Sequence, residues 1–171
     1  MLNAAMLATG AMLLTGCMTM RAAGRSVDFA TLFVLGSAIG LAAAVSESGL
    51  AQNIAEMLIA IGASDPYMAL AVVFVARAIM ANLITNAASA VFMYPIALSI
   101  AGQLDVSFMP FIIALMTGTV GALITPSAYQ TNLMVYGPGN YRFGDFMRAG
   151  IPLTIVVGVV TLILAPVVFS F

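Results

Sequence analysis

Several stretches of this chain contain no charged residue and are long enough to enter or cross a lipid bilayer. Among them are residues 2–20, 29–46 and 151–171. A transmembrane helix needs about 20 predominantly apolar residues, so each stretch predicts a membrane helix. A chain built around such stretches cannot fold as an ordinary soluble domain, because lipid must be the solvent for most of its surface.

The composition excludes several classes of function. Only 6% of the residues are charged and 63% are hydrophobic, whereas a soluble domain carries roughly a quarter charged residues. With no histidine and one cysteine, the chain has few ligands for zinc and cannot form an internal disulfide. It also lacks a histidine base, and we expect neither an enzyme nor a cofactor. The net charge of −1 provides no basic surface for nucleic acid.

The segment 50–61 differs from the uncharged stretches because it is amphipathic. Ile54 and Leu58 fall on one side of a helix, and Gln52 and Glu56 fall on the other. This pattern is typical of a helix that lies along the membrane interface instead of crossing the bilayer.

Two further segments are interrupted by polar residues. In residues 66–102, the sequence "TNAAS" separates an apolar helix from a shorter one, which predicts a re-entrant hairpin with a polar tip. In residues 107–136, Thr125-Pro126 interrupts an apolar helix, because proline cannot continue the helical hydrogen-bond ladder. The predicted fold class is therefore an all-α integral membrane protein, with residues 1–171 forming a single membrane domain.

The arginines predict the orientation. Arg21 and Arg25 fall in the expected loop 21–28, and Arg142 and Arg148 fall in the expected loop 137–150. The positive-inside rule predicts that both loops are cytoplasmic, in a multi-pass protein of the inner (cell) membrane.

The two polar breaks, 85–89 and 125–132, are the predicted functional part. Irregular backbone at membrane depth is tolerated only where protein buries it or where it lines a wet cavity. Half-helices that meet at such breaks present carbonyl oxygens, which suit sodium, and N–H groups, which suit an anion. The alternative is that the polar residues only join helices and the proline only bends one. For Arg77, on the first arm of the hairpin, we favour a role in holding the hairpin over a direct function.

Two longer stretches resemble a known family. They are "ITNAASAVFMYPIALSIA" (84–101) and "LITPSAYQTNLMVYGPGNYRFGDFMRAGIPLT" (123–154). They are similar to the C-terminal half of the divalent anion/sodium symporters, which belong to the ion transporter superfamily. The resemblance covers essentially the whole chain. It implies one inverted repeat of an elevator-type transporter, with a re-entrant hairpin and a broken transmembrane helix, that moves a dicarboxylate, citrate or sulfate with sodium.

The same resemblance implies site residues. It implies a sodium site formed by Asn86 together with the backbone around Ala81 and Ile124. It implies an anion site bordered by Thr85, Asn86, Ala87, Thr125 and Pro126. Ala87 departs from the family's Ser-Asn-Thr tip motif, so its side chain cannot supply the polar contact that the motif provides.

The resemblance also implies partners. A complete family member has two repeats and forms a homodimer, whereas 171 residues accommodate one repeat, so we expect an N-terminal repeat to be missing here. Two alternatives stay open. One is a superfamily member with another activity, such as arsenite transport or sodium/proton exchange. The other is a membrane assembly module that does not transport.

Overall fold

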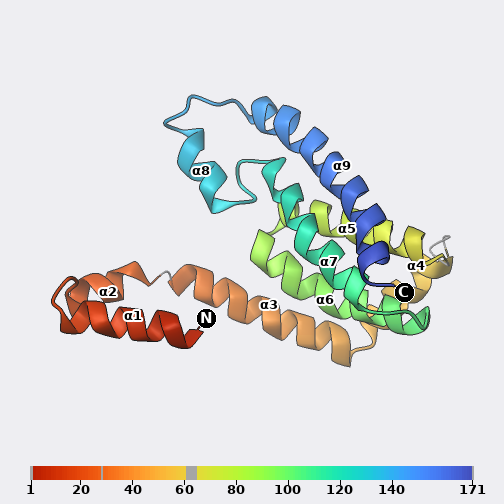
Figure 1. The fold of residues 1–171 in the computed structure, drawn as a ribbon, viewed down its shortest axis with the longest axis horizontal. Coiled ribbons are helices and arrows are strands. Elements are labelled where there is room, and N and C mark those ends of the chain that lie inside the picture. Colours follow the sequence, from red (N-terminus) through yellow and green to blue (C-terminus); the bar gives the residue numbers. More distant parts are fainter. Residues whose placement is uncertain (1, 28, 61–64, 171) are drawn as a thin grey trace. The chain divides into compact units, whose positions relative to one another are not determined.

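A computed structural model describes residues 2–27, 29–60 and 65–170 (Figure 1). The described part consists of helices and the turns and loops that connect them and contains no β-strand, which confirms the predicted all-α class. The chain divides into two compact units, residues 1–34 and 35–171, and each is described by itself. That the whole chain acts as one transport domain stays a prediction.

The first unit contains two short helices and the start of a third. Helix α1 (Leu2–Leu14) ends in a turn in which Gly16 has a φ of +72°. Helix α2 (Met20–Ser26) begins after Thr19, and the Thr19 hydroxyl accepts a hydrogen bond from the N–H of Ala22 at 3.2 Å. The 13 residues of α1 measure about 20 Å, less than the roughly 30 Å of bilayer hydrocarbon. The predicted continuous helix over 2–20 is therefore wrong, and the predicted loop 21–28 is helical up to Ser26.

Helix α3 (Phe29–Glu47) continues into the second unit and is followed by α4 (Leu50–Ala60). The axes of these two helices differ by 69° at a turn in which Gly49 has a φ of +73°. Ile54 and Leu58 pack against the core and Glu56 is exposed, as the amphipathic pattern predicted. Residue 61, the last of the expected segment, lies outside the described residues.

The predicted hairpin corresponds to α5 (Pro66–Leu83) and α6 (Asn86–Gln103). The second arm starts earlier than the polar tip suggested, because Thr85 caps α6 and Asn86 is already helical. Each arm has 18 residues and measures about 27 Å. Whether the arms dip into the bilayer or cross it stays a prediction.

The predicted broken helix is also present. Helix α7 (Met109–Thr117) tightens into the 3₁₀ segment η1 (Gly118–Leu123), residues 124–129 are irregular, and α8 (Gln130–Tyr136) follows. The last helix, α9 (Phe143–Val168), begins eight residues before the expected residue 151. Arg142 starts it by donating its N–H to Asp145 Oδ2 at 2.8 Å, so residues 143–150 are helix instead of the predicted loop.

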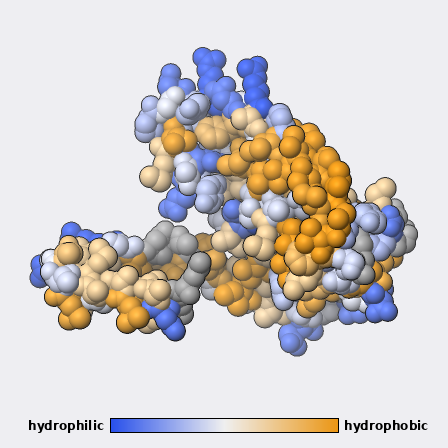
Figure 2. Space-filling view, viewed as in Figure 1, coloured by the Kyte–Doolittle hydropathy of each residue, from blue (hydrophilic) through white to orange (hydrophobic). Residues whose placement is uncertain are grey.

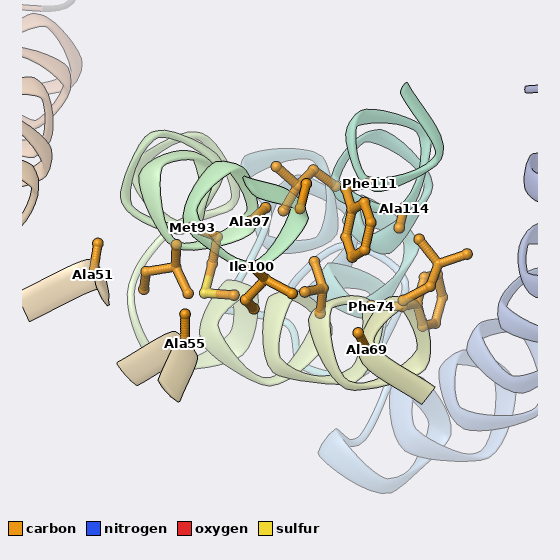
Figure 3. Packing of buried hydrophobic residues seen from close by; sticks show 14 of the residues in the cluster. Ala51, Ala55, Ala69, Phe74, Met93, Ala97, Ile100, Phe111 and Ala114 are labelled. Carbon is orange, nitrogen blue, oxygen red and sulfur yellow. The ribbon is translucent and has the colours of Figure 1, made fainter. Parts of the chain in front are cut away.

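Side chains from α4, α5, α6 and α7 meet in one hydrophobic core (Figure 3). Its labelled members are Ala51, Ala55, Ala69, Phe74, Met93, Ala97, Ile100, Phe111 and Ala114. Five of these nine are alanines, and such small side chains let helix backbones approach closely, as is usual in membrane bundles.

The surface over the middle of α9 is largely hydrophobic (Figure 2). Ile155, Val156, Ile163 and Leu164 are more than half exposed. Among the described residues, α5 and α9 are long and apolar enough to cross a membrane, and α3 with α4 makes a third span if the bent pair counts as one. Together these features support a multi-pass membrane protein.

Candidate functional site at two helix breaks

The first break separates the arms of the hairpin by two residues, Ile84 and Thr85. The N–H of Ile84 closes α5 on the carbonyl of Met80 at 3.1 Å, and the Thr85 hydroxyl accepts from the N–H of Ala88 at 3.2 Å. The last carbonyls of α5 and the first N–H groups of α6 therefore converge here, and most of them have no partner within their own helices. Such a place offers partial charges of both signs.

Arg77 on α5 ties this break together. Its side chain is 0% exposed. One terminal nitrogen, Nη2, donates to the Asn86 side-chain oxygen Oδ1 at 2.6 Å and to the Asn86 carbonyl at 2.9 Å, and the other, Nη1, donates to the Ser89 hydroxyl. Arg77 thus holds the two arms together, as the sequence suggested, but through neutral oxygens. No ion pair joins Arg77 to an acid within residues 2–27, 29–60 and 65–170.

The second break is held by two asparagine side chains. From α5, Asn82 Nδ2 donates to the carbonyl of Gly121 at 2.7 Å, and Asn82 Oδ1 accepts from the Thr125 hydroxyl at 2.9 Å. From α8, Asn132 Nδ2 donates to the carbonyls of Ala122 at 2.9 Å and Thr125 at 3.1 Å. Neutral amides therefore bind the carbonyls of Ala122 and Thr125 beside the irregular backbone, and they add a second donor to the Gly121 carbonyl, which also accepts from the N–H of Ile124 at 3.1 Å. Lipid could not supply such donors.

Glycines let the 3₁₀ segment before the second break approach α5 closely. A side chain at Gly121 would lie 2.5 Å from Ala78 Cβ, and one at Gly118 would lie 2.8 Å from Arg77 Cγ. The 3₁₀ segment therefore packs directly on α5. Gly150 of α9 approaches the other side of the break, where a Cβ would lie 2.6 Å from the carbonyl of Leu123.

The predicted sodium ligands are distributed over this contact. Ala81 is fully buried and packs with Ala122 and Ala128 of the second break. Ile124 is half-buried beside the same break. Asn86, in contrast, already uses its side-chain oxygen to accept from Arg77. The structure thus brings Ala81 and the 122–128 region together, and no hydrogen bond links Asn86 to that region within the described residues.

The predicted anion-site residues have different environments. Thr85 and Ala87 are exposed at the hairpin tip, Thr125 is half-buried, and Pro126 is buried. Thr125 is connected to the hairpin through Asn82, so the two polar breaks do belong to one assembly. The ligand roles of these residues stay predictions.

A cavity of about 500 Å³ lies between α5, the second break and α9. Its polar residues are Asn82, Thr125 and Thr154, and it is otherwise lined by apolar residues and a glycine. Such a lining suits lipid or an apolar helix face better than it suits a divalent anion, which needs charge or many donors. No group of acids and cysteines that could hold a metal ion occurs among the described residues.

Asn82 was not predicted as a site residue, because it lies inside an apolar helix and belongs to no recognisable motif or helix break. Its importance depends on a contact with Gly121, which is 39 residues away in the sequence. Ser89 lies in the polar tip, yet only the structure shows that it is Arg77's partner. The one available signal for both was that a polar side chain in a membrane helix needs a partner.

Comparison with known proteins identifies the family. Residues 2–171 match the citrate transporter family. The chain is 38% identical over 154 residues to probable sodium/sulfate cotransporter 3 of Chlamydomonas reinhardtii, and 36% identical over 154 residues to sodium/sulfate cotransporter 2 of the same alga. It is 33% identical over 156 residues to the uncharacterized transporter YfbS of Escherichia coli K12.

These alignments cover most of this chain but a small part of the relatives. They include 89% of the chain for both algal proteins and 91% for the bacterial one, but only 17% and 26%, respectively, of the relatives' own lengths. No solved structure matches the chain. The family and these relatives are transporters and not enzymes, which agrees with the absence of catalytic groups expected from the sequence. The chain belongs to the citrate transporter family of membrane proteins, as its resemblance to the divalent anion/sodium symporters predicted.

Proposed function

We propose that this chain is the C-terminal half of a secondary active transporter that takes up a small divalent anion, a dicarboxylate or sulfate, together with sodium. The observation that carries this proposal is that Asn82, near the end of α5 and just before the first break, binds the Gly121 carbonyl and the Thr125 hydroxyl at the second break. Two adjacent breaks in apolar helices are the arrangement by which transporters bind ions and substrates at membrane depth. The names of the algal relatives, sodium/sulfate cotransporters, support the same class of cargo.

In this proposal, sodium is the coupling ion and binds at the C-terminal end of α5, where the last backbone carbonyls of the helix have no helical partner. The ligands are Asn86 and the backbone oxygens of Ala81 and Ile124. The C-terminal end of α5 carries a partial negative charge, which favours a cation. No other metal or cofactor is required.

The anion binds next to the sodium ion, at the N-terminal end of α6. The bordering residues are Thr85, Asn86, Ala87, Thr125 and Pro126. The N–H groups at the start of α6 favour an anion, because they carry the partial positive charge of that helix. Thr85 and Ala87 are exposed, so a ligand can reach the tip.

The remaining part of the site comes from an N-terminal repeat, and the complete protein is a homodimer. The 17–26% of the relatives' length that aligns with this chain leaves room for that repeat. The protein lies in the inner (cell) membrane. Two polar segments face the cytoplasm, because their arginines favour that side. They include residues 21–28, with Arg21 and Arg25, and residues 137–142, with Arg142.

The test is uptake by proteoliposomes that contain the chain together with its N-terminal repeat. Radiolabelled sulfate, succinate and citrate are each supplied outside, with sodium or with choline as the cation. We expect sodium-dependent uptake of at least one of these anions, lost in Asn86→Ala and retained in Asn53→Ala, a control on the exposed side of α4.

Other outcomes distinguish the alternatives. Uptake that is equal in sodium and choline contradicts symport. Transport of arsenite but of none of the three anions, or sodium flux driven by a pH gradient alone, identifies a superfamily member with another activity. Normal cellular function of Asn86→Ala and Thr125→Val, with no transport by the parent protein, identifies an assembly module.

A further inference from the structure

Arg77 carries a buried positive charge without an acidic partner. Its side chain is 0% exposed, and its Nε is buried without any hydrogen-bond partner. Removing a cation from water is expensive unless its charge is compensated. Since none of the described acids forms an ion pair with it, the compensation comes from the dipoles of Asn86 and Ser89.

The atoms that compensate Arg77 are oxygens that would also suit a metal cation. Arg77 Nη2 contacts two oxygens of Asn86 at once, at 2.6 and 2.9 Å. The Ser89 hydroxyl donates to the same Asn86 carbonyl at 3.1 Å. The guanidinium is therefore bound at the hairpin tip in the manner of an ion, by neutral oxygen ligands.

We propose that Arg77 is a tethered cation: its guanidinium occupies the oxygens of Asn86 and competes with sodium for them. This inference rests on the proposed function only in taking Asn86 as a sodium ligand. Sodium binding then releases Arg77 from Asn86, and the freed N–H groups become available to an anion. A guanidinium suits carboxylate or sulfate because its paired N–H groups match two oxygens.

The contact of Arg77 with the 3₁₀ segment η1, which leads into the second break, connects this exchange to the rest of the site. Gly118, the first residue of η1, lies directly against the stem of Arg77, since a Cβ there would be 2.8 Å from Arg77 Cγ. A movement of the Arg77 side chain therefore changes the packing of the 3₁₀ segment. Sodium at the first break would in this way alter the second break, where Thr125 lies.

The direct test is Arg77→Met, which replaces the cation with an apolar side chain of similar length. Thermal unfolding of the purified protein is followed in detergent while sodium chloride replaces choline chloride at constant ionic strength. Because the competing charge-assisted hydrogen bonds are gone, the sodium concentration for half-maximal stabilisation should fall about tenfold. Arg148→Met, on the exposed start of α9, is the matched control and should respond like the parent. An unchanged or weaker sodium response in Arg77→Met overturns the inference.

Asn86→Asp tests the same idea with the opposite sign and does not depend on the folding of Arg77→Met. With a tethered cation nearby, the new carboxylate pairs with Arg77, and the sodium concentration for half-maximal stabilisation should rise about tenfold. Without such competition, a carboxylate is a stronger sodium ligand than an amide, and that concentration should fall. A fall therefore overturns the inference.

Failure of this inference can be told apart from failure of the proposed function. Sodium-dependent anion uptake by the parent protein, with no change in the sodium response of either variant, overturns the tethered cation and leaves the transporter intact. A parent that transports none of the anions fails the proposed function, whatever the two variants show in the unfolding assay.

Discussion

The two helix breaks are held together by different chemistry. At the hairpin tip a buried cation, Arg77, reaches from α5 to the first turn of α6 and binds Asn86 and Ser89. At the second break the side-chain amides of Asn82 and Asn132 bind carbonyls of the 3₁₀ segment and of Thr125. One break is thus held by a charge and the other by neutral dipoles.

This difference follows from what each break exposes. The hairpin tip presents the carbonyls of Asn86 and of the end of α5, and a cation can satisfy several oxygens at once. The second break loses its helical ladder over several residues, so that separate carbonyls need separate donors. In our proposal the charge makes the first break responsive to ions, whereas the neutral amides make the second break a fixed support.

The largest effect is expected from Gly121→Ala, which tests whether the second break is a fixed support. The added Cβ would lie 2.6 Å from the Cα of Ala78 and 2.9 Å from its carbonyl oxygen. Because these are backbone atoms of α5, the 3₁₀ segment must move, and we expect a loss of about 3 kcal/mol in the free energy of unfolding. Urea unfolding in detergent measures it.

Gly102→Ala provides the matched control, because no atom lies within 4 Å of a Cβ at that position. It should leave the free energy of unfolding nearly unchanged. Equal stability of the two alanine variants would show that the second break adapts easily, and the contrast between the breaks would be lost.

The next largest effect is expected from Asn82→Leu. This change removes one of the two donors to the Gly121 carbonyl and leaves the Thr125 hydroxyl without its acceptor. The loss of both hydrogen bonds should lower the free energy of unfolding by about 2 kcal/mol. Asn53→Leu, on an exposed position of α4, is the control and should have no such effect. An equal loss of stability in Asn53→Leu would mean that the effect comes from replacing a polar side chain with an apolar one, and not from losing the hydrogen bonds of Asn82 with Gly121 and Thr125.

The sequence was sufficient to place both breaks, for a physical reason. Polar clusters and proline are conspicuous in apolar helices, because membrane depth tolerates them only with partners. The starts of α4 and of the hairpin were also predictable, from an amphipathic pattern and from the Pro66 that opens α5.

Other features could not be read from the sequence. The end of α1 depends on Gly16 in a left-handed conformation, yet the residues around it are as apolar as a continuous helix. The start of α9 depends on a cap between Arg142 and Asp145 inside a segment rich in glycine. Asn82 and Arg77 acquire their roles from residues brought close by folding, which no local spacing specifies.

Ser89→Ala tests the charge-held break with a smaller expected effect. Ser89 is fully buried and is one of the two residues that accept from Arg77. Loss of a hydrogen bond to a charged group should lower the free energy of unfolding by about 1.5 kcal/mol. In the Arg77→Met background the same change should have almost no effect, because the partner is gone. Ser127→Ala, exposed in the second break, is the control. An equal loss from Ser89→Ala in both backgrounds would contradict the proposed role of the pair.

The smallest effect is the expected coupling between the two breaks. Ser89 and Asn82 share no hydrogen-bond partner, so the losses from Ser89→Ala and Asn82→Leu should add to within about 0.5 kcal/mol in the double variant. This additivity describes the ion-free protein, in which the charge-held and the amide-held break each stabilise their own segment. If the Arg77 stem transmits ion binding through Gly118, the additivity should fail once sodium is present. The free energies of unfolding of the parent, the two single variants and the double variant, measured in sodium chloride and again in choline chloride, test this change. If the departure from additivity is the same in both salts, the two breaks only lie side by side.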